Sequence, residues 1–525
     1  KYLSMLERNP SADDAEILAS LALADIADYI TAVFDNNFSL IRYAEAIAGS
    51  ISSFSDIEKQ LDAPVLSVFY EQLLSEKIPS VNEKTVFCIS IPFPGTFTAA
   101  LYTAQYLKKH FGKNAVIGIG GGYVNTELRN LHEPKIFSYI DFVSYDRGYG
   151  SFISLFNAGF FKENEKNIFN GKEYYKIKYC LNGKIIGNSD TEELSEFSAE
   201  IKLENDLTKQ IIPDFSDIDF SVYPHLADTT NPMQRIWSDG TWMKVYLAYG
   251  CYWHRCAFCD TSLEYVKGYC LTDIQTLYKG LRIQAAQTNV YGLHFVDEAC
   301  PPAALKQFAL LNCAEEKRFT FWGNIRFEKT FTRDLADLLS YGGMTGVSAG
   351  IEIATGDGLN AVNKGTTLEN IVGACCAFKE AGILVHSYMI YGFWNQSEQD
   401  LIDSMETLRQ FFAAGLLDSA FWHKFTLTKH STVYKEWEQG KHPDLKPVFS
   451  AKDSFAENEV QFEGENESEK YGNALNVALE NWMNGEKINK PVKDWFDFKM
   501  PEPSIKKNFI DTLIKKYENN RDLQF

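Results

Sequence analysis

The strongest constraint on the fold of this chain is a long alternation of short apolar runs and amphipathic stretches in its second half. A first run, 243–250 ("MKVYLAYG"), is followed by five more that are rich in β-branched and aromatic residues, at 290–298, 318–327, 346–354, 383–393 and 419–428. The stretches between these later runs carry apolar residues at helical spacing. Repeated units of this kind predict a parallel sheet that closes into a full or partial β/α barrel, with its functional site at the carboxyl ends of the strands.

A shorter alternation of the same type lies in the first half. Runs at 85–93 ("TVFCISIPF"), 114–122 ("NAVIGIGGG") and 139–148 ("YIDFVSYDRG") are separated by helical patterns, which predicts an open parallel α/β sheet. A chain of 525 residues is too long for one compact core, so we expect several domains. The expected division is a helical segment at 1–83, the open sheet at 84–200, a linker at 201–240, the barrel at 241–435 and a C-terminal extension at 436–525.

Charge and composition exclude several classes of protein. The formal net charge of −19 argues against a general nucleic-acid binder, because binding a polyanion needs a surplus of Lys and Arg. No apolar run is long enough for a membrane span, and the first residues lack the basic-then-apolar order of a secretion signal. The ten cysteines are scattered over the chain, which favours reduced thiols over a disulfide scaffold. We therefore expect a cytoplasmic protein without membrane or nucleic-acid partners.

Three cysteines follow the first strand of the expected barrel. The stretch "YGCYWHRCAFCD" (249–260) contains Cys251, Cys256 and Cys259 and has no fourth cysteine within ten residues. A structural zinc site needs a second pair of ligands at finger-like spacing, and His254 and Cys270 form no such pair. A cubane iron–sulfur cluster held by three thiolates keeps one iron without a protein ligand. The sequence therefore favours a 4Fe-4S cluster whose open iron takes a cofactor or substrate, with zinc and three buried thiols as the alternatives.

This cysteine loop resembles that of the radical S-adenosylmethionine enzymes. In that family three cysteines after the first barrel strand hold a 4Fe-4S cluster, and S-adenosylmethionine chelates the fourth iron. The commonest family spacing is C-x3-C-x2-C, whereas four residues stand here between Cys251 and Cys256. The form "GCYW-x-x-C-x-F-C-D" nevertheless is similar to one branch of the family. The resemblance covers about residues 240 to 435 and implies both the cluster and S-adenosylmethionine as cofactors.

Further positions are similar to the S-adenosylmethionine site of the family. The resemblance places Phe258 beside the adenine, although simple core packing explains this ring as well. It places Asp297 or Glu298, in "FVDEA", against the methionyl amino group, with a strand-end cap as the alternative. The remaining polar positions at the ends of later strands are Asn324, Arg326, Ser348 and Glu352, the last two toward the ribose and carboxylate. The sequence assigns no general acid or base.

The first sheet resembles the flavodoxin-like, Rossmann-type domain that binds cobalamin in one class of these enzymes. The nearest match is "IGGGYVNTELR" (119–129), where Gly120, Gly121, Gly122 and Tyr123 follow a strand and open toward a helix. Missing side chains there would let a corrinoid approach the backbone, but a tight turn is the alternative. No Asp-x-His-x-x-Gly follows the first strand, so the resemblance implies cobalamin without a histidine from that motif on cobalt.

The other cysteines carry no further cluster. Cys88, Cys180, Cys270, Cys313, Cys375 and Cys376 fit core or isolated thiols, and Cys300 is a weaker candidate for a catalytic role beside Asp297. Because no cysteine follows Cys376, we expect no auxiliary-cluster domain of the type that many peptide-modifying relatives carry.

The resemblance implies a cobalamin-dependent C-methyltransferase that acts through a 5′-deoxyadenosyl radical. The branch is similar to enzymes that modify ribosomally made peptides, so a peptide or small natural product is the expected substrate, and a flavodoxin or ferredoxin is the expected electron donor. Two alternatives remain open: a radical enzyme that rearranges or modifies its substrate without methylation, and an iron–sulfur or zinc binding module without turnover.

Overall fold

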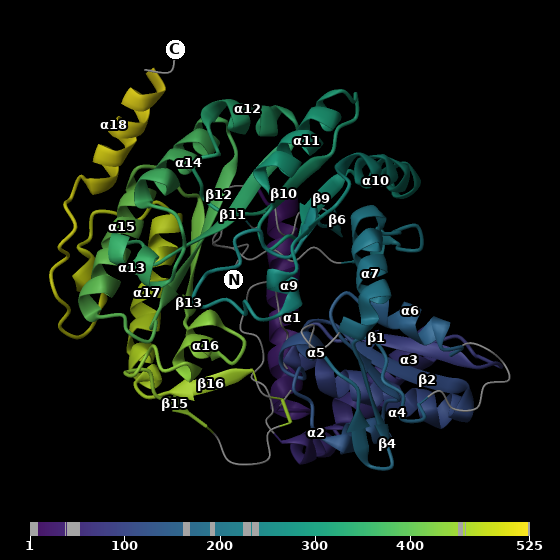
Figure 1. Cartoon of the computed structure of the whole chain (residues 1–525). Helices are drawn as coiled ribbons and strands as arrows, with labels where there is room; N and C mark the ends of the chain where they lie inside the picture. The colour runs from purple at the N-terminus through teal and green to yellow at the C-terminus, as the bar shows by residue number, and fades with distance from the viewer. Residues whose placement is uncertain are drawn as a thin grey trace. The chain divides into compact units, whose positions relative to one another are not determined.

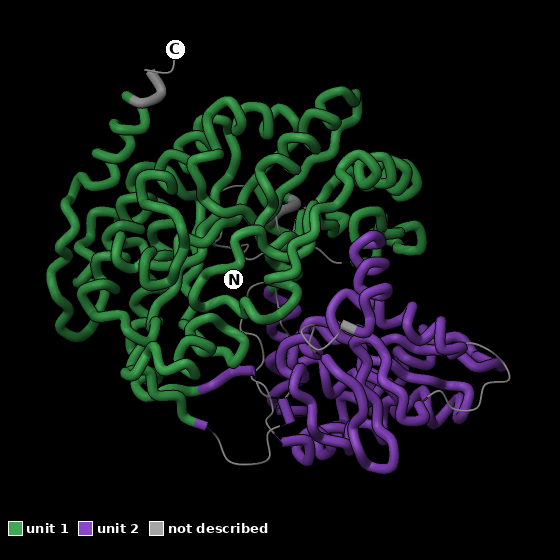
Figure 2. The backbone as a smooth tube through the Cα atoms, in the orientation of Figure 1, with its two compact units in different colours: residues 1–20, 208–448, 461–525 green, residues 21–207, 449–460 purple. Residues whose placement is uncertain are grey.

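The chain divides into two compact units. The computed structural model describes residues 9–36, 38, 53–160, 169–189, 195–223, 233, 241–449, 455–456 and 458–522. Unit 1 comprises residues 1–20, 208–448 and 461–525, and unit 2 comprises residues 21–207 and 449–460 (Figure 2). Each unit has a sheet and an apolar core of its own.

Unit 1 is built on a six-stranded parallel sheet. Its order is β13 (Ser419–Lys424), β12 (Leu384–Tyr391), β11 (Met344–Glu352), β10 (Thr320–Ile325), β9 (Gly292–Phe295) and β6 (Trp242–Val245). Every neighbouring pair in this order is parallel. Each strand lies within one of the six apolar runs of the sequence, or overlaps it closely, so the expected partial barrel is confirmed.

Helices between the strands cover one face of this sheet (Figure 1). They are α10 (Ile274–Thr288), α11 (Pro302–Cys313), α12 (Arg333–Tyr341), α14 (Leu368–Glu380) and α15 (Glu398–Ala413). Four of them begin at a side chain that accepts a hydrogen bond from the first turn, which satisfies an otherwise unpaired backbone N–H; these caps are Asp273, Thr332, Thr367 and Ser397. These helices therefore begin at defined positions after the strands.

The two faces of the sheet carry different residues. In β11, Val347, Ala349 and Ile351 are buried in the main apolar core with the covering helices. The alternate residues Ser348 and Glu352 belong to the opposite face, because successive side chains of a strand point to opposite sides. The helix-covered face supplies the apolar core, and the opposite face carries the polar groups.

The C-terminal segment is part of unit 1 and not an appended extension. The helix α17 (Glu469–Met483) contributes Leu475, Leu479 and Trp482 to the core of the barrel. The acidic stretch before this helix has the composition of a solvated loop, but Glu459–Phe462 forms the strand β16. The expected boundary at residue 436 therefore does not separate the barrel from the C-terminal residues.

Unit 2 contains a mixed five-stranded sheet. Its order is β1 (Thr85–Ser90), β2 (Ala115–Gly120), β3 (Phe142–Ser144), β4 (Ile177–Leu181) and β5 (Lys184–Ile186). The first three strands are parallel and match the expected α/β alternation. The hairpin β4 and β5 adds antiparallel pairs that the sequence analysis did not anticipate.

Two helices before the sheet share its core. Phe54 and Ile57 of α2 (Phe54–Gln60) and Leu74 of α3 (Glu71–Lys77) are buried in one cluster with Ile117 of β2. Phe455, from far along the chain, joins them with its ring centroid 5.4 Å from that of Phe54. The expected boundary at residue 84 therefore falls inside one folded unit.

The expected linker at 201–240 is described only in part. Its first residues continue the helix α7 (Ser198–Gln210), and the Phe215 N–H donates to the Gln284 side chain at 2.8 Å. Residues 224–232 and 234–240 lie outside the described residues.

The N-terminal helix α1 (Ala12–Val33) is 22 residues long. Within the described part of the chain, neither α1 nor any other helix has the length and apolar character that a membrane crossing requires.

Candidate functional site

The cysteine loop is held by backbone hydrogen bonds on both sides. It follows the short strand β7 (Ala248–Tyr249), which pairs with β8 (Cys270–Leu271). The Cys251 N–H donates to the Val266 carbonyl at 2.8 Å, and the Ala257 N–H donates to the Val362 carbonyl at 2.9 Å. These bonds fix the loop at the carboxyl ends of the strands, where a barrel carries its site.

All three cysteines line one cavity of about 230 Å³. Strands β9 to β12 and the segments after them supply the opposite walls. Of the other residues singled out in the sequence, the cavity brings together Phe258, Glu298, Asn324, Arg326, Ser348 and Glu352. Thiols, cations, carboxylates and neutral polar groups from five separate segments therefore meet in one place.

Asp297 anchors the base of the cysteine loop. Its carboxylate accepts hydrogen bonds from the N–H groups of Leu247 and Ala248 at 2.9 and 2.8 Å, just before the first cysteine. Asp297 is buried and does not line the cavity. The strand-end cap therefore describes its contacts, and contact with a methionyl amino group does not.

Two buried cations border the thiols. The Arg326 guanidinium lies 3.8 Å from Cys256 Sγ and donates to the Lys364 carbonyl at 2.6 Å. The Lys364 ammonium donates to Glu352 Oε1 at 2.7 Å and lies 5.8 Å from the centroid of the Phe258 ring. A thiolate next to these charges is stabilised by Coulomb attraction that burial strengthens.

Glu352 reaches Lys364 from a strained backbone. Its φ of 72° lies in the left-handed region, and the pairing of β11 with β12 shifts register between Gly350 and Glu352. A Cβ on Gly350 would stand 1.8 Å from Glu352 Oε1, so only glycine leaves room for this carboxylate. Such strain tends to gather at functional sites.

The thiols differ in their acidity. The hydrogen bond from Cys259, together with the charges of Lys364 and Arg326, lowers the pKa of Cys256 to about 6. The same hydrogen bond and burial raise the pKa of Cys259 well above its usual value. One thiolate therefore forms readily at neutral pH, as a metal ligand requires.

Two polar atoms in the cavity wall have no partner. Asn324 Oδ1 and Ser348 Oγ are buried and accept or donate no hydrogen bond. An unsatisfied buried polar atom costs about 1–3 kcal/mol, so these atoms favour a polar ligand in the cavity.

The thiols are not arranged around a single ion. Among the described residues, no three His, Cys, Asp or Glu side chains are placed to hold one metal ion. In a cubane each thiolate binds a different iron, so three thiols that share a cavity wall are compatible with a cluster without meeting at one point.

The three glycines at the end of β2 pack closely against their own chain. Gly121 has a φ of 101°, and a Cβ there would stand 2.7 Å from the Ile91 carbonyl oxygen. A Cβ on Gly122 would stand 2.8 Å from the carbonyl oxygen of Pro92, and one on Gly120 would stand 3.2 Å from that of Ser144. The tight turn and close packing account for these glycines, and they show no open cradle.

Tyr123 faces the interior of unit 2. Its side chain is 2% exposed, and its ring centroid lies 5.1 Å from that of Phe97. A corrinoid at the end of β2 therefore does not reach this ring without a rearrangement of the core.

The sequence analysis missed Lys364 and Trp253. Lys364 stands in a loop 105 positions after Cys259 and carries no local pattern that marks it. Trp253 lies in the cysteine loop itself, where the Arg326 guanidinium stands 4.7 Å from its ring centroid. A catalytic role for Cys300 has no support, because this thiol is fully buried and burial raises its pKa well above the usual value.

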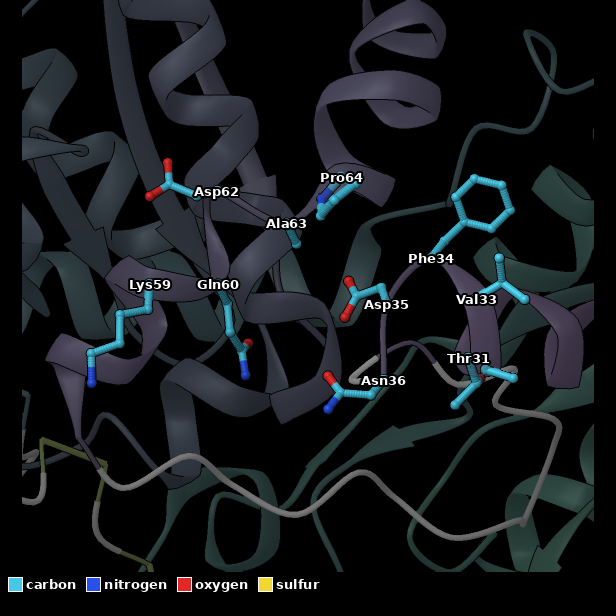
Figure 3. A pocket seen from close by; sticks show the side chains of 11 residues that line it. Thr31, Val33, Phe34, Asp35, Asn36, Lys59, Gln60, Asp62, Ala63 and Pro64 are labelled. Carbon is cyan, nitrogen blue, oxygen red and sulfur yellow. The ribbon is translucent and has the colours of Figure 1, made fainter.

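A second hollow, of about 450 Å³, lies in unit 2 between the end of α1 and the segment after α2 (Figure 3). Its lining contains the carboxylates of Asp35 and Asp62 and the ammonium group of Lys59, but no thiol or imidazole. It therefore offers none of the soft metal ligands of the first cavity.

Comparisons with known proteins relate the fold of this chain to that of solved structures. No family model matches the chain. Among curated proteins, an uncharacterized methyltransferase of Pyrococcus horikoshii is 23% identical over 357 residues, which cover 66% of this chain and 69% of that protein.

Solved structures with a similar fold include two enzymes. The radical S-adenosylmethionine methyltransferase TsrM from Kitasatospora setae, solved with cobalamin and a 4Fe-4S cluster bound, gives a TM-score of 0.51 at 14% identity over 74% of this chain and 73% of that chain. The cobalamin-dependent S-adenosylmethionine radical enzyme OxsB, solved with aqua-cobalamin, gives 0.54 at 13% identity over 88% of this chain and 65% of that chain. The expected resemblance is confirmed at the level of the fold.

Proposed function

We propose that this chain is a radical S-adenosylmethionine enzyme that holds a 4Fe-4S cluster through Cys251, Cys256 and Cys259. The observation that carries the proposal is the single cavity in which these thiols meet two buried cations and two unpartnered polar atoms. The fold shared with TsrM and OxsB supports it.

The residues of the cavity fit the cluster and S-adenosylmethionine. Arg326 and Lys364 offset the negative charge of the thiolates, and Glu298 and Glu352 offer carboxylates to an amino group. Asn324 and Ser348 offer hydrogen bonds to a ribose or a carboxylate, and Phe258 offers a flat face to adenine.

If bound, a reduced cluster would give one electron to S-adenosylmethionine, which would break a carbon–sulfur bond to release methionine and a 5′-deoxyadenosyl radical able to abstract hydrogen from an unactivated carbon. The contribution of the chain is to position the reacting groups and to exclude water from the cavity. Arg326 is held by Glu328 and Lys364 at 3.0 and 2.6 Å, so its charge keeps one position beside Cys256. A flavodoxin or ferredoxin is the proposed electron donor.

The finer proposal is C-methylation with cobalamin bound at the strand ends of unit 2. Its support is the parallel part of the sheet, β1 to β3, and the likeness to two structures solved with cobalamin. Gly120, Gly121, Gly122 and Tyr123 pack internally, so they do not fit a corrinoid as they stand, and no step of the reaction runs through cobalamin.

The internal packing of these glycines and Tyr123 favours a second candidate function, a radical reaction without methyl transfer. Mass spectrometry with S-adenosylmethionine carrying a deuterated methyl group separates the two. Methylation adds the label to the product, whereas the second candidate yields 5′-deoxyadenosine and an unlabelled product. A peptide or a small natural product is the proposed substrate in both cases.

Anaerobic reconstitution with iron and sulfide tests the cluster. We expect about four irons per chain, a brown chromophore and 5′-deoxyadenosine after reduction in the presence of S-adenosylmethionine. Each of Cys251→Ala, Cys256→Ala and Cys259→Ala is expected to abolish all three, while Cys88→Ala and Cys376→Ala retain them. A triple alanine variant that still binds four irons contradicts the proposal, as does a reconstituted protein that binds only zinc.

A further inference from the structure

A row of aromatic and imidazole rings begins at the edge of the cavity and continues onto the neighbouring strand β13. Tyr388 of β12 lines the cavity together with the three cysteines. Its ring centroid lies 4.6 Å from that of His386 and 5.6 Å from that of His423. The ring of His423 in turn lies 4.6 Å from that of Phe421. We call Tyr388, Phe421 and His423 the ring wall.

The ring wall lies on the same face of the sheet as the polar groups of the cavity. Tyr388 is paired in register with Gly350 on one side and with Phe421 on the other, and Gly350 lines the cavity. His423 follows Phe421 by two positions and therefore shares its face. The intervening residues Met389 and Trp422 are buried in the core on the opposite, helix-covered face.

These rings do not serve as ordinary barrel filling. The interior of a barrel is commonly packed with branched aliphatic side chains. Here β13 is the last strand of the sheet among the described residues, Tyr388 and Phe421 are only partly buried, and His423 is exposed. Each of the three side chains therefore keeps part of its surface exposed, and Tyr388 contributes to the lining of the cavity.

The position of Tyr388 is fixed by His386, two positions before it in β12. His386 Nδ1 lies 2.6 Å from Ser419 Oγ, which fixes the imidazole against which Tyr388 packs edge to face. Burial lowers the pKa of His386 to about 3, so this imidazole is neutral at physiological pH. It therefore places no positive charge beside the ring of Tyr388. A preorganised set of rings of this kind loses little conformational entropy when another ring binds against it.

We propose that Tyr388, Phe421 and His423 recognise the substrate and select one that carries a planar aromatic ring. The inference rests on the proposed function for its location, since Tyr388 lines the cavity of the cysteine loop and Phe421 is paired with it in register. Aromatic faces prefer offset or edge contacts with other rings, and the phenol and imidazole groups add hydrogen bonds to a polar edge. An aromatic side chain of a peptide and an aromatic small molecule share this chemistry.

The test uses two capped amino acids as probes. Equilibrium dialysis of the reconstituted protein measures the dissociation constants of N-acetyl-tryptophan amide and N-acetyl-leucine amide. We expect the tryptophan probe to bind about 10-fold more tightly, with most of this preference lost in Tyr388→Leu, Phe421→Leu and His423→Ala. Tyr341→Leu removes an exposed ring on α12, 64% accessible, and serves as the matched control that retains the preference.

The outcomes separate this inference from the proposed function. Equal affinity for the two probes in the unmodified protein overturns the ring wall, as does a preference that all three variants retain. His423 is exposed, so His423→Ala keeps the test valid if either of the other variants fails to fold. The formation of 5′-deoxyadenosine is measured in the same samples. If it is absent while the preference for the tryptophan probe persists, the radical chemistry alone is rejected. If it is present without that preference, the ring wall alone is rejected.

Discussion

The guanidinium of Arg326 lies 3.8 Å from the sulfur of Cys256 and is fixed there by three further contacts. It donates to Glu328 at 3.0 Å and to the Lys364 carbonyl at 2.6 Å, and it stands 4.7 Å from the ring centroid of Trp253. Because the side chain is buried, its charge acts on the thiolate with little screening by solvent.

Arg326→Met is expected to lower the reduction potential of a reconstituted cluster. Removal of a cation and of a hydrogen bond to a ligating sulfur disfavours the electron-rich state, with a shift on the order of tens of millivolts. A redox titration followed by electron paramagnetic resonance measures it. Arg333→Met, on the partly exposed face of α12, is the control. An unchanged potential in Arg326→Met would show that this contact does not tune the cluster.

The effects of substituting Lys364 and Glu352 on the unfolding free energy are expected to be strongly non-additive, because the two side chains form a buried ion pair. Glu352→Gln leaves the ammonium buried without its carboxylate, 2.7 Å away, which costs about 3–5 kcal/mol of unfolding free energy. Lys364→Met leaves the carboxylate alone at a comparable cost. The double variant is expected to lose much less than the sum of the two, and urea unfolding of the metal-free protein measures all three. Additive losses would contradict a direct pair.

Asp297 is expected to make stability depend on pH. Burial raises its pKa to about 7, although the Leu247 and Ala248 amides oppose this. The folded carboxyl therefore binds a proton that the unfolded one releases near pH 4, and its contribution to stability is lost as pH rises from about 4 to about 7.

Asp297→Asn removes this titration. Unfolding free energies at a series of pH values should show the wild-type protein losing up to roughly 4 kcal/mol relative to the variant across that window. Asp337→Asn, on the exposed side of α12, is the control for the loss of one carboxyl group. Parallel profiles for wild type and Asp297→Asn would mean that the buried carboxyl titrates normally.

Regular alternation made the architecture predictable. Each strand of the barrel sheet coincides with a run of apolar residues, because a strand covered by helices must present such residues to the core. The family resemblance singled out polar residues in those runs, Asn324, Ser348 and Glu352 among them, and these residues do line the cavity. Polar groups inside apolar strands need partners in any case, which agrees with their position at the cavity.

Other features depend on contacts between distant segments that no local pattern encodes. Lys364 approaches Cys256 only because the loop after α13 (Gly356–Ala361) returns to the cysteine loop, where the Asn363 side chain donates to the Arg255 carbonyl. Phe455 joins the core of unit 2 from the far end of the chain. Asp297 and Glu298 are adjacent in the segment after β9, yet Asp297 accepts from the Leu247 and Ala248 amides and Glu298 lines the cavity.

Substitution of Gly121 tests whether this glycine serves the fold of unit 2 or the approach of cobalamin. Gly121→Val places a branched side chain at a φ of 101° and with its Cβ 2.7 Å from the Ile91 carbonyl oxygen, so we expect unit 2 to lose at least about 2 kcal/mol of unfolding free energy. Gly112 also has a positive φ, 55°, but a Cβ there meets nothing within 4 Å. Gly112→Ala is therefore the matched control, with the smaller cost of backbone strain alone.

Hydrogen exchange of unit 2 and cobalamin uptake, measured on the same variants, decide between the two roles. If Gly121 is structural, amides of β1 and β2 lose protection in Gly121→Val even without cobalamin, while the iron content of the cysteine loop is unchanged. If the glycine serves corrinoid approach instead, protection persists and only uptake falls. Cobalamin that does bind is expected to show a base-off spectrum, because no Asp-x-His-x-x-Gly follows β1 to supply an axial imidazole.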